Sequence, residues 1–190
     1  MLTYRTSAAL VSLSALIVSL TACSSKADTE DLTEAAADTA SIETIPLSVA
    51  GREFFTATFE MGLLEIEAAK LAGEKSESLP VREFAELMLQ SYSRTNDSIR
   101  QIALSNHFEL PQQPDGKGRE LLEKLAKLEG PEFDRLYSTE MREAHKQAVQ
   151  SFAMLAQTSP DPIVHTFAQT QLPATRDRFR IAQSLPGNIG

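Results

Sequence analysis

The sequence predicts an all-α fold, a bundle of four long helices and one short helix. From Pro46 onward, apolar residues recur at steps of three and four, which is the period of an amphipathic helix. No stretch alternates apolar and polar residues over the length of a strand. The chain has 190 residues, enough for one such bundle at residues 49–186 behind an N-terminal targeting segment.

Residues 1–22 are predicted to form a lipoprotein signal peptide. The apolar run Ala8–Leu20 is too short to span a bilayer as a helix but suits a signal peptide. It leads into Leu20-Thr21-Ala22-Cys23, which resembles the bacterial lipobox, whose cysteine receives a diacylglycerol. Cys23 is the only cysteine of the chain, so it has no partner for an internal disulfide. The alternative is an ordinary signal peptide that Cys23 follows by chance.

Lipidation of Cys23 predicts a protein of the bacterial cell envelope, held at the membrane by its acyl chains. Each buried CH2 of an acyl chain contributes about 0.8 kcal/mol of membrane affinity, and more than one chain gives stable anchoring. Ser24 stands where an aspartate would signal retention at the inner membrane. The lipoprotein sorting rule therefore predicts the outer membrane, with the protein facing the periplasm.

Residues 23–48 are predicted to be the lipidated cysteine followed by an acidic, flexible tether. The stretch Ser24–Ser48 has no aromatic residue and one base, Lys26, so it has too little apolar surface to order itself. A short helix at Leu32–Ala40 is the alternative. The acidic residues of the tether are Asp28, Glu30, Asp31, Glu34, Asp38 and Glu43.

The acidic composition excludes some classes of partner. The chain has 18 Lys and Arg residues against 26 Asp and Glu residues, a net charge of −8, and no run of basic residues. This balance argues against nucleic acid and against electrostatic binding to anionic lipid. The partners we expect are the membrane, through Cys23, and an unidentified protein or small molecule.

The first two helices are predicted at Val49–Gly73 and from Leu79 to just before His107. Gly62 costs about 1 kcal/mol relative to Ala inside a helix, so we expect a close helix crossing there. We expect Gly73 to end the first helix, Ser78 to cap the second and Pro80 to lie in its first turn. The core-facing positions are Phe55, Phe59, Gly62, Ile66 and Ala69, with Phe54, Met61, Glu65, Ala68 and Ala72 beside them, and then Val81, Phe84, Ala85, Met88, Tyr92, Thr95, Ile99 and Ile102.

The loop Glu109–Gly118, rich in Pro and Gly, leads to a short helix at Arg119–Leu128. Long helices follow at Phe133–Ala156 and Pro162–Ser184, the latter with a kink expected at Pro173 and a frayed end at Pro186–Gly190. Their core-facing positions are Tyr137, Met141, His145, Ala148, Phe152 and Leu155, and then Val164, Phe167, Ala168, Leu172, Thr175, Phe179 and Ala182. Two helix pairs joined by a crossover connection make a ferritin-like four-helix bundle, here with a short extra helix in that connection.

Short matches to a known family occur in order along these helices. They are Arg52-Glu53-Phe54, Leu64–Ala72, Val81–Ala85, Met88, Asn96, Phe133-Asp134-Arg135, Tyr137, His145, Ala148-Val149, Asp161-Pro162, Phe167-Ala168, Leu172-Pro173 and Arg176. Together they resemble the domain-of-unknown-function 4142 family (DUF4142), exported bacterial proteins with a ferritin-like fold. The resemblance covers about residues 51–182.

The resemblance also implies three histidines, of which this chain retains one. The family pattern has Asp-His where this chain has Ser91-Tyr92, and a histidine where it has Arg178, whereas His145 is kept. A ferritin-type di-iron site needs four carboxylates and two Glu-x-x-His pairs, and no Glu-x-x-His occurs in the chain. We therefore predict no metal and no cofactor.

Glu65, Tyr92, His145 and Arg178 each come from a different long helix, on or beside its core-facing stripe. We predict that they form a buried polar cluster in which Arg178 pairs with Glu65 and supplies the charge that a metal would supply. The favoured role is a hydrogen-bonded network that fixes helix register, and the alternatives are an altered ligand or metal site and catalysis. We assign no catalytic residue, because no nucleophile–base pair is evident.

The remaining histidines and methionines are expected to have structural roles only. We expect His107 and His165 at the surface, and the methionines as core fillers. The methionines concerned are Met61, Met88, Met141 and Met154.

Two functions are compatible with these observations. The favoured one is a noncatalytic envelope lipoprotein whose tethered helical bundle binds a protein or a small molecule. The alternative is a ferritin-like, metal-dependent oxidoreductase with an altered metal site.

Overall fold

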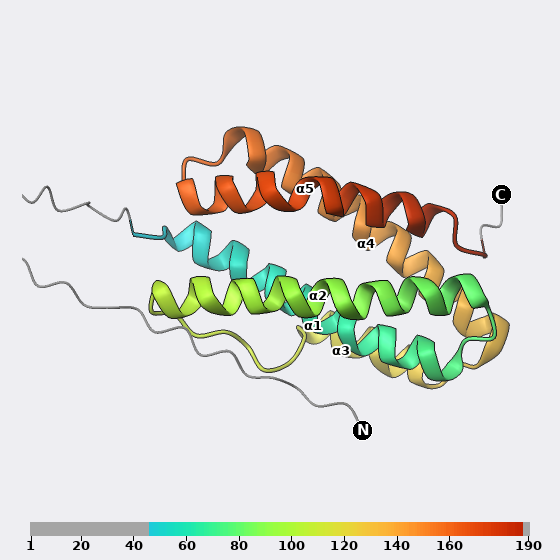
Figure 1. Ribbon diagram of the computed structural model, residues 1–190. Coiled ribbons are helices and arrows are strands. Elements are labelled where there is room, and N and C mark those ends of the chain that lie inside the picture. Colours follow the sequence, from blue (N-terminus) through green and yellow to red (C-terminus); the bar gives the residue numbers. More distant parts are fainter. Residues whose placement is uncertain (1–45, 188–190) are drawn as a thin grey trace, which may run out of the picture. The chain divides into compact units, whose positions relative to one another are not determined.

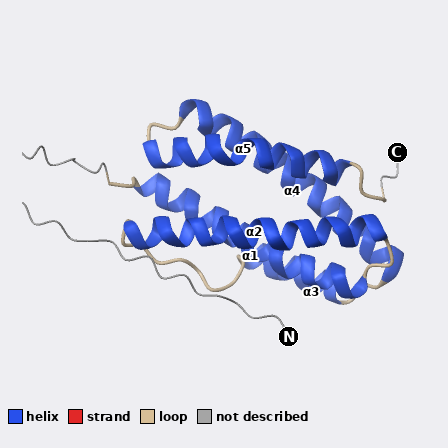
Figure 2. Ribbon diagram, viewed as in Figure 1, coloured by secondary structure: helices blue, strands red, loops and turns tan. Residues whose placement is uncertain are grey.

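The computed structural model describes residues 46–187, and this part of the chain is an all-α bundle, as the sequence predicts (Figure 1). No strand occurs within the described residues (Figure 2). The predicted signal peptide, Cys23 and all but the last three residues of the predicted tether lie outside this range. The helices are α1 (Val49–Lys75), α2 (Leu79–Ser105), α3 (Gly116–Ala126), α4 (Gly130–Thr158) and α5 (Pro162–Gln183).

The four long helices pack as two hairpins. α1 lies against α2 and α4 lies against α5, each pair joined by a short turn, while residues 106–129 make the long connection and contain α3 (Figure 1). α3 packs on α1, where Leu125 is fully buried and Leu121, Leu122 and Leu128 are half-buried. The predicted bundle with an extra helix in its crossover connection is thereby confirmed.

The helix ends follow local capping chemistry. The Ser48 hydroxyl accepts a hydrogen bond from the Gly51 N–H at 2.9 Å and caps α1. The prediction that Gly73 ends α1 is wrong, because Gly73 lies inside α1, which continues to Lys75. The predicted start of α2 is confirmed, with Ser78 as its N-cap residue and Pro80 in its first turn, but the Ser78 hydroxyl makes no capping hydrogen bond. The Ser76 hydroxyl instead accepts the Ser78 N–H, so the turn between the helices uses a neighbouring side chain.

Asp161 joins the start of α5 to the start of α1. One oxygen of its carboxylate accepts the N–H groups of Ile163 at 3.0 Å and Val164 at 3.3 Å, and the other accepts the Ser48 N–H at 2.8 Å. The side chain therefore caps one helix and holds the residue that precedes another. Asp115, the N-cap of α3, accepts only the nearby Gly118 N–H, at 2.7 Å.

The core divides into two clusters along the bundle. One contains Phe84, Met88, Tyr137 and Met141 from α2 and α4, and the other contains four phenylalanines from α1, α4 and α5. Glu65 and His145 lie between the two clusters in the order of residues along α1 and α4. The four phenylalanines are Phe55, Phe59, Phe152 and Phe167.

α1 and α2 approach each other closely at Gly62, where the sequence predicts a close crossing. A Cβ atom on Gly62 would lie only 2.1 Å from Oδ1 of Asn96 and 2.8 Å from its Nδ2. Asn96 is fully buried, so its amide occupies the space that the missing side chain leaves. Glycine is thus required here by packing rather than by backbone conformation.

α5 runs as one α-helix through Pro173, and the predicted kink stays a prediction. Within residues 46–187, no helix combines the length and the apolar character that crossing a bilayer requires.

Candidate functional site

Each long helix contributes one residue of the predicted polar cluster to the middle of the bundle. Glu65 is 1% exposed, Tyr92 1%, His145 0% and Arg178 7%. The four side chains form a chain of contacts across the interior. Nδ1 of His145 lies 3.7 Å from Oε1 of Glu65, the rings of His145 and Tyr92 meet edge to face at 6.1 Å, and the Arg178 guanidinium lies over the Tyr92 ring at 5.1 Å.

His145 is a neutral core residue. Its Nδ1 lies 2.9 Å from the Met141 carbonyl oxygen, and its Nε2 lies 3.2 Å from Sδ of Met88. Because a carbonyl oxygen only accepts hydrogen bonds, this contact places the proton of the neutral ring on Nδ1. Burial lowers the pKa of His145 to about 4, which the bond to Met141 counteracts only in part and the nearby charge of Arg178 reinforces. The imidazole is therefore uncharged at neutral pH.

Glu65 is a protonated acid at neutral pH. Burial raises its pKa to about 8, although the positive charge of Arg178 acts in the opposite direction. Oε2 has no hydrogen-bond partner among residues 46–187. The 3.7 Å separation from His145 is longer than a hydrogen bond. Glu65 and His145 are therefore neighbours in uncharged forms rather than an ion pair.

The two pKa shifts affect stability in opposite directions. For Glu65 the folded pKa lies above the ordinary 4.5, so its contribution is complete below pH 4.5 and is lost as the pH rises toward 8. For His145 the folded pKa lies below the ordinary 6.5, so its contribution is complete above pH 6.5 and is lost as the pH falls toward 4. Between pH 6.5 and 8, only the Glu65 change operates.

The direct Glu65–Arg178 pair expected from the sequence is not formed. Nη2 of Arg178 donates to the Thr175 hydroxyl at 3.0 Å, on the same helix, and the guanidinium packs on Tyr92 of α2. Nε of Arg178 has no partner among the described residues. The guanidinium is held by Thr175 and Tyr92 instead, and burial of Glu65 without an ionic partner favours its uncharged form.

The interior of the bundle also buries polar groups that the sequence analysis did not assign to the polar cluster. The hydroxyl groups of Tyr137 and Ser138 and both amide atoms of Asn96 are buried and unpartnered within residues 46–187. Burial raises the pKa of the Tyr137 and Tyr92 hydroxyls, so both stay protonated. Tyr137 and Asn96 fall on core-facing stripes of their helices, and this placement could have predicted their burial from the sequence.

The side chains do not fit the di-iron centre that a ferritin-like bundle implies. Within residues 46–187, no group of three or more His, Cys, Asp or Glu side chains is arranged to hold a metal ion. The middle of the bundle instead offers one protonated carboxyl group, one neutral imidazole and one arginine. The carboxyl group and the imidazole are of the kinds that bind metals, but they are far fewer than the four carboxylates and two histidines of a di-iron centre.

The other histidines and the methionines have varied positions. His107 is exposed and His165 is half-buried. Met88 and Met141 are core residues, and Met61 packs against the core from its edge. Met154 is 57% exposed, so its prediction as a core filler is wrong. It lies one residue away from the stripe of α4, beyond Phe152, where the helix faces solvent.

A comparison with family models gives one match, to the domain of unknown function DUF4142, over residues 32–185. The match begins inside the predicted tether and reaches the end of the bundle. A search of curated proteins gave no match. A search of solved structures also gave none. Because the family model covers most of its length, the chain belongs to the DUF4142 family.

Proposed function

We propose that the protein is a noncatalytic lipoprotein of the bacterial cell envelope, a helical bundle that binds a partner while acyl chains on Cys23 hold it at the membrane. The lipobox-like Leu20-Thr21-Ala22-Cys23 supports the anchor. Ser24 supports the outer membrane as its place, facing the periplasm. The acidic stretch before Leu47 gives the bundle reach from the membrane surface. The tether predicted from the sequence extends too far, because Leu47 is buried in the core and Ser48 caps α1.

The burial of the polar cluster is the observation that carries the noncatalytic assignment. Glu65, Tyr92 and His145 are at most 1% exposed. A general acid or base must come within hydrogen-bond reach of its substrate. Tyr92 and His145 line none of the grooves described below, and Glu65, which lies at the floor of the groove between α1, α3 and α4, is almost fully covered. Each of these groups contacts a defined neighbour on another helix, and such contacts fix how the helices align with one another.

The surface of the bundle is where a partner is expected to bind. A groove of about 490 Å3 lies where α1, α3 and α4 meet, and a second of about 330 Å3 continues along α1 and α4. The two share Met61, Ala144 and Gln147, so they form one furrow that α3 covers over part of its length. Its walls combine apolar and charged side chains, which suits a small molecule or a protein segment.

Metabolic labelling with a fatty-acid probe tests the anchor. The intact protein should incorporate the probe and fractionate with outer membranes, whereas Cys23→Ser should do neither. Cys23 is the only thiol, so the substitution removes the one acceptor and nothing else. Equal labelling of the two proteins would disprove lipidation at this residue. Near-stoichiometric iron or manganese in protein purified without chelators would instead favour the oxidoreductase.

A further inference from the structure

A small polar hollow of about 210 Å3 lies between α2 and α5, on the outer side of the buried cluster. Two of its lining residues are arginines and none is acidic, in a protein whose net charge is −8. One alanine also lines it. The polar lining residues are Ser91, Arg94, Thr95, Ser98, Gln171 and Arg178.

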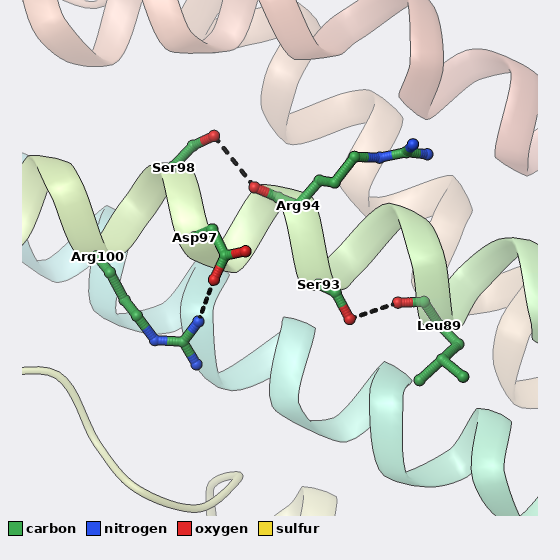
Figure 3. Close-up of polar contacts among 6 residues, drawn as sticks. All are labelled: Leu89, Ser93, Arg94, Asp97, Ser98 and Arg100. Carbon is green, nitrogen blue, oxygen red and sulfur yellow. Dashed lines mark hydrogen bonds and ion pairs between the residues drawn. The ribbon is translucent and has the colours of Figure 1, made fainter.

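The carboxylates closest in sequence to the two arginines are engaged elsewhere. Asp97 pairs with Arg100 at 2.6 Å, and Figure 3 shows the Arg94 side chain extending away from that pair. On α5, Asp177 pairs with Arg180 at 3.1 Å rather than with Arg178. Neither carboxylate lines the hollow, so its positive charge is not neutralised locally.

Arg178 is the deeper of the two arginines, and no carboxylate of the described part of the chain pairs with it. It is more than nine-tenths buried, and its contacts are the Thr175 hydroxyl and the face of Tyr92. Its Nε is buried without a partner among residues 46–187. The positive charge of Arg178 lowers the pKa of Glu65, but burial keeps that pKa at about 8, so Glu65 is uncharged at neutral pH and supplies no counter-charge. A buried cation without a counter-charge is costly, and a bound anion would relieve that cost.

We propose that the hollow between α2 and α5 binds a phosphate-like oxyanion, held between the guanidinium groups of Arg94 and Arg178. Guanidinium groups match the oxygens of phosphate with pairs of charge-assisted hydrogen bonds. Hydroxyls of Ser91 and Thr95, on the same face of α2, supply further donors. The anion is either free, as inorganic phosphate, or the headgroup of an anionic lipid. The net charge of −8 disfavours long-range attraction to an anionic membrane, so we expect the free anion.

Isothermal titration with inorganic phosphate in a chloride buffer tests the site. The full chain carries Cys23→Ser throughout, so that acylation contributes nothing. Saturable binding is expected, and Arg94→Gln should weaken it at least about tenfold, because a charge-assisted contact is lost. Arg180→Gln is the matched control. Arg180 is an exposed arginine of α5 that is paired with Asp177 outside the hollow, and its loss should leave the affinity unchanged.

Arg178→Lys tests the deeper arginine without removing its charge. A point charge replaces the planar fork, so phosphate affinity should fall while circular dichroism still shows the helical bundle. Sedimentation with phosphatidylcholine vesicles, with and without phosphatidylglycerol, distinguishes the sources. Binding to phosphatidylglycerol that Arg94→Gln abolishes would identify a lipid headgroup, and phosphate binding alone would identify the free anion. Absence of saturable binding to both probes, or equal weakening by Arg94→Gln and Arg180→Gln, would overturn the proposal.

Discussion

Gly62→Ala and Gly73→Ala should change the stability of the bundle in opposite directions, although both glycines lie within α1. A Cβ on Gly62 would lie 2.1 Å from Oδ1 of the fully buried Asn96, whereas a Cβ on Gly73 has no neighbour within 4 Å. Neither glycine has a positive φ, so alanine is tolerated by the backbone at both positions. The two substitutions therefore separate the packing effect from the effect of helix propensity.

The magnitudes follow from these two effects. Overpacking of a buried site costs typically about 1–3 kcal/mol, and the overlap with Asn96 places Gly62→Ala near the upper end. Replacing a helical glycine with alanine returns roughly 1 kcal/mol. Gly62→Ala should then destabilise the bundle by about 2 kcal/mol. Gly73→Ala should stabilise it by about 0.5–1 kcal/mol.

Urea denaturation followed by circular dichroism measures both values. The decisive comparison adds Asn96→Ala, which removes the atoms closest to the new Cβ. In that background the cost of Gly62→Ala should largely disappear, because the overlap is gone. If Gly62→Ala costs the same with and without Asn96, the account of close packing at Gly62 is refuted. If Gly73→Ala destabilises the protein, the account of Gly73 as an open helical position is refuted.

Three further predictions concern the interior, the helix caps and the tether. Between pH 6.5 and 8, stability should fall by up to about 1.4 kcal/mol per pH unit, because Glu65 keeps its proton in the folded state and not in the unfolded chain, and Glu65→Gln should flatten that slope. Chemical denaturation across this range checks it, and an unchanged slope in the variant would contradict it. Asp161→Ala should cost about 1–2 kcal/mol, more than Asp115→Ala, because only Asp161 also holds Ser48. Equal melting temperatures for the two variants would argue against that link. Limited proteolysis should cut within residues 24–45 first, ahead of the buried Leu47, and leave a core that melts at an unchanged temperature; a large loss of stability would show that the tether packs.

Much of the fold was predictable because each long helix carries an uninterrupted apolar stripe between clear breakers. Pro80, Gly130-Pro131 and Asp161-Pro162 fix where three of the helices begin. Gly73 was less informative. Glycine ends a helix only where the chain turns into a left-handed conformation, and here Ser76 ends α1 in an extended one.

The polar cluster was predictable in its members but not in its pairing. An apolar stripe identifies which face of a helix is buried. This is enough to predict that Glu65, Tyr92, His145 and Arg178 lie in the interior. It does not give distances across the bundle or protonation states. The neutral forms of Glu65 and His145 result from burial by all four helices, so the expected ion pair could not be judged from spacing alone.

The hollow beside Arg178 had a sequence signal that was not recognised. Ser91, Arg94, Thr95 and Ser98 follow one another at helical spacing on α2 and make a polar line beside its apolar stripe. The second half of the hollow comes from α5. No local pattern shows that the two segments face each other.

Native mass spectrometry of the protein extracted from membranes without chelators tests the proposed function most directly. One spectrum reports both the mass of the mature chain and any bound metal. The account predicts a chain that begins at Cys23, carries the added mass of acyl groups and holds no stoichiometric metal. A chain without acyl mass, or one with near-stoichiometric iron or manganese, would contradict the proposal of an anchored, noncatalytic helical bundle.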